Sequence, residues 1–138
     1  GRHHADARNH IKQYGASEYI LMLDNDVAMP PGSLAAMRDF LADHPDYGAI
    51  VLCKHDSLTF ATDADWLSAH HVDMSCVLFR RAVLTQVTFL DRHNQDRLGR
   101  KSRGCECANC CADIRAIGLR IGFLPNVTAD HLHQQARA

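Results

Sequence analysis

Short apolar runs alternate with amphipathic stretches along the chain, a pattern typical of strands that alternate with helices. Four apolar runs of strand length predict strands at 19–23, 49–53, 72–79 and 119–124. Apolar positions at helical spacing predict helices at 5–16, between Ser33 and Pro45, at 80–86 and at 106–117. Turn and helix-end signals fall between several of these elements, at Pro30-Pro31-Gly32, Pro45 and Gly118. The order predicts an α/β fold whose sheet is at least partly parallel.

The same pattern predicts which side chains are buried. The continuous apolar run Tyr19–Leu23 suits a central strand that is covered on both faces. Ser33 is expected to cap the helix that follows it. One face of the first helix carries Ala7, Ile11 and Tyr14. The apolar face of the second helix consists of Leu34, Met37, Phe40 and Leu41.

The composition is that of a single globular domain. Of the 138 residues, 46% are hydrophobic, and 15 basic side chains nearly balance 16 acidic ones, for a net charge of −1. This balance argues against a nucleic-acid-binding arm and against a disordered chain. The apolar runs, of about five residues, are too short to span a bilayer. The polar stretch Gly1–Asp6 lacks the apolar region of a signal peptide, which predicts a cytoplasmic protein. Attachment to the cytoplasmic face of a membrane through segments outside this chain is left open, as is the oligomeric state.

The most distinctive polar feature is Asp24-Asn25-Asp26, which directly follows the first predicted strand. In open α/β sheets, ligands bind beyond the carboxyl ends of strands. Two carboxylates this close repel each other unless a cation lies between them, and Mg²⁺ or Mn²⁺ suits such oxygen ligands. The alternative is an acidic turn, in which Asp and Asn serve the loop geometry.

Several segments around this triplet occur in a characteristic order. They are Ala7-Arg8-Asn9, Glu18–Asp26, Pro31-Gly32-Ser33-Leu34, His44–Ile50, Leu78–Ala82 and Gly118–His131. The set resembles the inverting family 2 glycosyltransferases and spans nearly the whole chain. The resemblance implies a partial GT-A fold, with a mixed sheet flanked by helices. It also implies transfer of a sugar from a nucleotide-sugar donor to a hydroxyl of a glycan, lipid or protein.

The resemblance assigns roles to individual residues. Asp26 is expected to be the more direct ligand of Mn²⁺ or Mg²⁺, with Asp24 nearer the ribose or the metal. His131 matches a position where members of the family often place a further metal ligand, and His133 is a weaker candidate. Arg8 is grouped with the donor-binding residues. Arg80-Arg81 is expected to begin a solvated helix, with contact to a phosphate as the alternative.

The catalytic base is less simple to place. The family's E-D-x-D motif falls on Glu106, but Cys107 stands where Asp is usual and Asn109 stands at the later Asp position. Glu106 is therefore the expected base. Two alternatives remain open. In the first, Asp113 is the base, because it shares a helical face with Glu106 and Asn109. In the second, the protein is a degenerate, inactive homologue.

Four cysteines fall close together, at Cys105, Cys107, Cys110 and Cys111. The short spacings are those of a zinc ligand set, so a non-catalytic zinc module is an alternative function. In a continuous helix, however, the four sulfur atoms point in different directions. Free thiols on a helix, or a redox pair, therefore remain open. Another α/β nucleotide-binding enzyme, such as a nucleotidyltransferase, is a third class.

Comparison with the family pattern predicts that the domain 1–138 is truncated at its amino terminus, with a divergent short form as the alternative. A GT-A domain of this family begins with a strand–helix–strand unit that holds the nucleotide base. That unit has no counterpart here, so an unpaired sheet edge is expected, and such an edge favours pairing with another chain.

Overall fold

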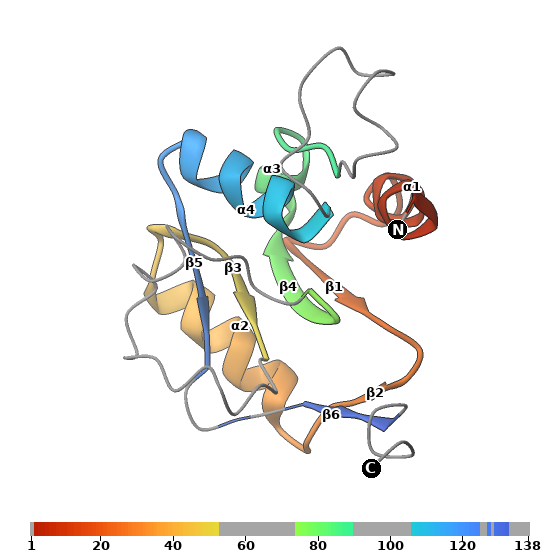
Figure 1. Ribbon diagram of the computed structural model, residues 1–138. Helices are drawn as coiled ribbons and strands as arrows, with labels where there is room; N and C mark the ends of the chain where they lie inside the picture. Colours follow the sequence, from red (N-terminus) through yellow and green to blue (C-terminus); the bar gives the residue numbers. More distant parts are fainter. Residues whose placement is uncertain (1, 53–73, 90–105, 125–126, 128, 133–138) are drawn as a thin grey trace.

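The structure is a computed structural model that describes residues 2–52, 74–89, 106–124, 127 and 129–132, without the side chains of 2–5, 106–108 and 131. Its helices are α1 (Arg2–Ile11), α2 (Ser33–Asp43), α3 (Arg81–Leu84) and α4 (Glu106–Ala116). Its strands are β1 (Tyr19–Leu23), β2 (Val27–Ala28), β3 (Tyr47–Val51), β4 (Cys76–Arg80), β5 (Arg120–Phe123) and β6 (Asp130–His131) (Figure 1). None of the described helices is long and apolar enough to cross a membrane.

The main sheet is mixed, as the sequence predicts. Its strand order is β1-β4-β3-β5. The β1–β4 and β4–β3 pairs are antiparallel, with Leu21 opposite Leu78, and the β3–β5 pair is parallel. Helix α2 packs against β3 and β4, whereas α4 packs against β5. The fold class is therefore confirmed: a mixed α/β sheet flanked by helices.

Within the described sheet, β1 lies at one edge and not at the predicted central position. Ile20 and Met22 are buried, while Leu23 is 44% exposed. A run of apolar residues indicates contact with other apolar groups. It does not tell whether neighbouring strands lie on both sides.

The first helix also differs from its prediction. It ends at Ile11 and is followed by a tight turn, in which the N–H groups of Gln13 and Tyr14 donate to the carbonyls of His10 and Ile11. The expected buried face is turned outward, since Ile11 is 46% and Tyr14 61% exposed. Polar bonds attach α1 to the rest of the chain, so its apolar face is not the one that packs.

A glycine lies at the beginning of α2 and another after the end of α4, and only the prediction for α4 is confirmed. Ser33 is not the N-cap of α2: Gly32 takes that place with a φ of 79°, and the Ser33 hydroxyl donates to the Pro30 carbonyl. Gly118 follows α4 as predicted, with a φ of 86°. The N–H of Gly118 donates to Arg115 and that of Leu119 to Ile114, which is the Schellman arrangement.

The remaining boundaries differ by a few residues. β3 begins two residues before the predicted strand, and β4 begins midway along its predicted span and ends one residue beyond it. The beginning of that span, at 72–73, lies outside the described residues. The small β2–β6 sheet was not predicted, because two residues per strand are too few for a periodic signal. Figure 1 shows this sheet beyond the end of β1.

The core is formed by buried side chains from the main sheet and from the helices packed on it. Met37 and Leu41 come from the predicted apolar face of α2, while Leu34 of that face is 48% exposed. The largest fully buried side chains are Phe79, Phe89, Met37, Leu41, Ile50, Leu52, Met74, Leu84, Ile114 and Ile121. This core holds the carboxyl end of β1 in place.

Candidate functional site

The acidic triplet forms a β-turn at the carboxyl end of β1. The N–H of Val27 donates to the Asp24 carbonyl over 3.2 Å, and the N–H of Asp24 donates to the Ser75 carbonyl over 2.8 Å. The two acids are therefore held by backbone bonds at both ends of the turn. Aspartate is a favoured first residue of such turns, so the geometry by itself also accounts for Asp24.

The β2–β6 pair brings the end of the chain to this turn. Val27 lies opposite His131, and the N–H of Leu132 donates to the Asp26 carbonyl over 2.7 Å. The backbone of His131 therefore lies beside the residue that follows Asp26. The side chain of His131, and all of His133, lie outside the described residues.

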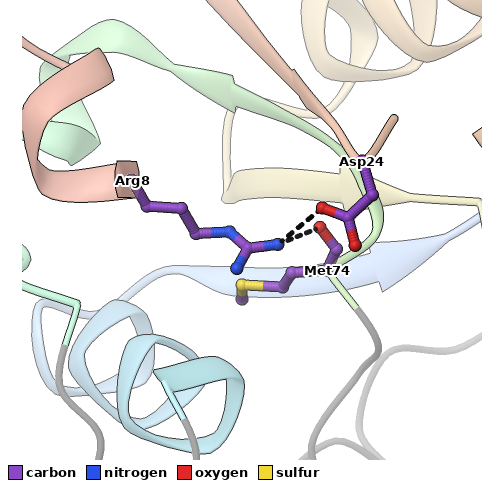
Figure 2. Close-up of polar contacts among 3 residues, drawn as sticks. All are labelled: Arg8, Asp24 and Met74. Atoms are coloured by element: carbon purple, nitrogen blue, oxygen red, sulfur yellow. Dashed lines mark hydrogen bonds and ion pairs between the residues drawn. The ribbon is translucent and has the colours of Figure 1, made fainter. Parts of the chain in front are cut away.

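Arg8 of α1 contacts the same turn (Figure 2). Its Nη2 atom lies 3.3 Å from Oδ1 of Asp24 and 2.9 Å from the carbonyl oxygen of Met74. The Arg8 side chain is only 7% exposed, against 29% for that of Asp24. Arg8 thus connects three segments that are far apart in the sequence: α1, the end of β1 and the residues before β4.

Two further side chains hold α1 in place. The amide group of Asn9 donates to the Phe89 carbonyl over 2.8 Å and accepts the Phe89 N–H over 2.9 Å. The Lys12 ammonium donates to the Val87 carbonyl over 2.6 Å, and burial lowers its pKa. The Ala7-Arg8-Asn9 segment therefore docks α1 onto the segments around β4. The sequence alone does not reveal this role, since polar residues on a helix are usually solvated.

A groove of about 390 Å³ runs along the open side of β1. It is lined by α1 residues Ala7, Arg8 and Ile11, and by the β1 end from Leu21 to Asn25. Asp24 thus faces a cavity at the strand end, while Asp26 is not among the lining residues.

The predicted base, Glu106, is the first residue of α4. One turn further on, Cys110 is fully buried, and burial raises the pKa of its thiol well above the ordinary 9.0. The negative charges of Cys111 and Asp113 raise that pKa further, whereas the positive charges of Arg8 and Lys12 lower it. Cys110 therefore lies near Arg8, and Figure 1 shows the beginning of α4 turned toward α1. The backbone of Glu106 is about 6 Å further along the helix axis.

The alternative base and its neighbour lie further along α4. Asn109 is 1% exposed, and Asp113 is partly exposed. The side chains of Glu106 and Cys107 lie outside the described residues. The choice among Glu106, Asp113 and an inactive homologue stays as the sequence leaves it.

The cysteine cluster is only partly described. Cys110, Cys111 and Cys76 are buried free thiols. Burial raises the pKa of Cys76 to about 11, and the charge of Asp24 adds to the effect. Cys105 and the side chain of Cys107 lie outside the described residues, so a zinc site stays a prediction. Among the described side chains, no three of His, Cys, Asp or Glu lie close enough together to hold a metal ion.

A helix begins at Arg80-Arg81 as predicted, with Arg80 as the N-cap of α3 and Arg81 as its first residue, but both guanidinium groups bond backbone carbonyls. The Arg80 guanidinium donates to the carbonyls of Tyr47, Leu41 and His44. That of Arg81 donates to the carbonyls of Tyr14 and Ser17. The first connects β4 to the end of α2, and the second connects α3 to the α1–β1 loop. Both guanidinium groups donate to backbone carbonyls, and no described contact joins either of them to the acidic turn.

Comparison with known proteins bears on the fold alone. No protein-family model and no curated protein matches the chain. A solved structure of the mannosyltransferase PcManGT from Pyrobaculum calidifontis, in complex with GDP-Man and Mn²⁺, is similar, with a TM-score of 0.60 and 21% sequence identity. The match covers 91% of this chain and 35% of that chain, so the chain spans about a third of the length of this neighbour. The chain thus has a glycosyltransferase-like fold.

Proposed function

We propose that the chain is part of a metal-dependent, inverting glycosyltransferase of family 2 with a GT-A fold. Its substrates are a nucleotide-sugar donor and a hydroxyl of a glycan, lipid or protein. One observation carries the proposal: the turn that bears Asp24 and Asp26 ends β1, and its Asp24 lines a groove, in a fold similar to that of a mannosyltransferase solved with GDP-Man and Mn²⁺. Ligand sites of open α/β sheets lie at such strand ends.

The residues of the turn suit a hard divalent ion. Asp24 and Asp26 offer carboxylate oxygens, the ligands that Mn²⁺ and Mg²⁺ prefer. In this proposal both acids hold the ion, and His131, whose backbone lies beside the turn, adds a third ligand. The bound ion supplies positive charge against the diphosphate that leaves in the reaction. The other contributions come from the protein.

Glu106 is the proposed base. As the acceptor oxygen forms its bond to the anomeric carbon, the bond from that carbon to the nucleoside diphosphate breaks, and the hydroxyl proton passes to the Glu106 carboxylate. The configuration at the carbon is inverted because one displacement occurs. The position of α4 supports this role, since Cys110 lies near Arg8 and Arg8 contacts Asp24.

We also propose that residues 1–138 form one domain that is incomplete at its amino terminus, and that the missing segment adds a strand to β1. The 35% coverage of the neighbour and the groove along the open side of β1 support this. Within the described residues, the thiols of Cys76, Cys110 and Cys111 are free, as thiols are in a reducing compartment, and this supports a cytoplasmic location.

The proposal is tested by calorimetric titration of GDP and UDP into the protein with and without Mn²⁺. We expect nucleotide binding that requires Mn²⁺ and weakens more than about tenfold in Asp26→Asn, a loss of about 1.4 kcal/mol. Asp39→Asn is the matched control, because Asp39 is exposed on α2, where it pairs with the equally exposed Arg38. Binding that is independent of Mn²⁺, or equal in both variants, would remove the acidic turn from the donor site.

A further inference from the structure

We propose that Arg8 is a positioning residue, which orients the Asp24 carboxylate and does not itself bind the donor. The inference rests on the proposed function of the acidic turn and changes the role that the family resemblance gives to Arg8. It begins from burial. The Arg8 side chain is only 7% exposed, although Arg8 is one of the residues that line the groove. A group this buried has little surface left with which to contact a diphosphate.

The second step is geometric. One Nη2 atom of Arg8 faces both Oδ1 of Asp24 and the carbonyl oxygen of Met74 (Figure 2). The Met74 carbonyl lies one residue before Ser75, whose own carbonyl accepts the N–H of Asp24. Hydrogen bonds therefore tie both the side chain of Asp24, through Arg8, and its backbone to the segment that enters β4. A planar guanidinium can hold two such acceptors at a fixed angle, which an ammonium group cannot do equally well.

The third step concerns how firmly Arg8 itself is held. Asn9 makes two bonds to the backbone of Phe89, and Lys12 makes one to Val87. These bonds fix α1 independently of Asp24. The position of Arg8 relative to the turn is consequently fixed before any ligand binds.

The fourth step is electrostatic. Asp24 and Asp26 lie two residues apart in one turn, and their charges repel when no cation is present. The positive charge of Arg8, 3.3 Å from Oδ1, offsets part of this repulsion and leaves the carboxylate in one orientation. Partners that orient metal ligands in this way typically contribute about 10- to 100-fold in affinity. The acidic turn is thus preorganised by a cation that belongs to the protein.

The experiment is a double-mutant cycle read by calorimetric titration of GDP in the presence of Mn²⁺. Arg8→Ala should weaken binding about 10- to 100-fold in the wild-type background. In the Asp24→Asn background the same change should cost less than about twofold, because a positioning residue acts only through its partner. Arg8→Lys should recover part of the loss. Arg38→Ala, on the exposed face of α2, is the control and should leave binding unchanged. An equal loss in both backgrounds means direct donor contact and overturns the proposal.

A second measurement needs neither metal nor nucleotide. Hydrogen exchange at the amides of Asp24 and Val27, which donate to Ser75 and Asp24, should accelerate more than about tenfold in Arg8→Ala. The amide of the buried Phe79 reports global unfolding and should not change. Unchanged exchange at the turn refutes the positioning role, even if the wild-type protein proves not to bind nucleotide. Absence of nucleotide binding with accelerated exchange refutes the proposed function alone. If Arg8→Ala does not fold, Arg8→Lys provides both readouts.

Discussion

Three buried or half-buried arginines, Arg8, Arg80 and Arg81, donate mainly to backbone carbonyls. Each joins segments that are distant in the sequence. Arginine suits this use, because its fork of donors satisfies carbonyls that the ends of helices and loops leave without partners. At the acidic turn, Arg8 donates both to a backbone carbonyl, that of Met74, and to a carboxylate, that of Asp24.

The thiol of Cys110 predicts a dependence of stability on pH. Burial holds its pKa in the folded protein well above the ordinary 9.0. The neutral thiol is therefore favoured by folding, and its contribution is complete below pH 9. As the pH rises above 9, the unfolded chain loses this proton first, and the contribution is lost progressively until the folded pKa is reached.

We accordingly expect wild-type stability to fall relative to that of Cys110→Ala by up to about 1.4 kcal/mol per pH unit above pH 9. Urea unfolding of both proteins between pH 7 and 10.5 measures the difference. Since both carry the same remaining groups, parallel curves would show that Cys110 ionises normally in the fold.

At the scale of elements, α4 and β3 approach each other closely at Gly48. A Cβ atom on Gly48 would lie 3.2 Å from a methyl group of Ile114 and 3.3 Å from one of Val83. This explains why glycine stands at position 48, which in the sequence is only one member of a family-like pattern. The contact belongs to the packing of α4, the helix that begins at Glu106.

The attachment of α2 to β4 yields a prediction for Arg80. Arg80→Met keeps the apolar stem but removes the bonds to Tyr47, Leu41 and His44. We expect a loss of about 2 kcal/mol, because bonds from a charged donor are typically worth about 1.5–3 kcal/mol. Urea unfolding measures the change. Arg38→Met, on the exposed side of α2, should stay within about 0.5 kcal/mol of wild type. Equal small effects of both substitutions would mean that the Arg80 bonds exchange freely with water.

At the scale of the whole molecule, β1 has one side on which the described chain supplies no neighbouring strand. The N–H of Asp24 donates to the Ser75 carbonyl, and the N–H of Arg81 donates to the Glu18 carbonyl. The backbone N–H and C=O groups of the even-numbered residues of this segment therefore point toward β4. The backbone groups of Leu21 and Leu23 consequently point to the open side. There the described chain offers them no partner strand, and the groove beside α1 remains.

This arrangement predicts the effect of extending the polypeptide. If a segment encoded before Gly1 adds a strand to β1, the amides of Leu21 and Leu23 should become at least about tenfold more protected from hydrogen exchange. Mn²⁺-dependent affinity for GDP or UDP should increase at the same time. Comparison of the extended protein with residues 1–138 measures both quantities. Protection that does not change would place the added segment elsewhere.

Much of the local structure follows from the sequence. The apolar runs at 19–23 and 119–124 became β1 and β5, and Gly118 ends α4 as expected, because strand periodicity and helix termination depend on residues close in the chain. The acidic turn was placed at a strand end for the same reason. Whether its residues bind an ion stays a prediction.

Other features depend on partners that the local pattern does not contain. The position of β1 at the sheet edge, the outward face of α1 and the docking of Arg8 against Asp24 were decided by tertiary structure. The sequence by itself determined which segments become helices or strands and where the acidic pair stands among them. Only the packing of distant segments decided which faces are covered and which charge meets Asp24, because burial and ion pairing are properties of spatial neighbours.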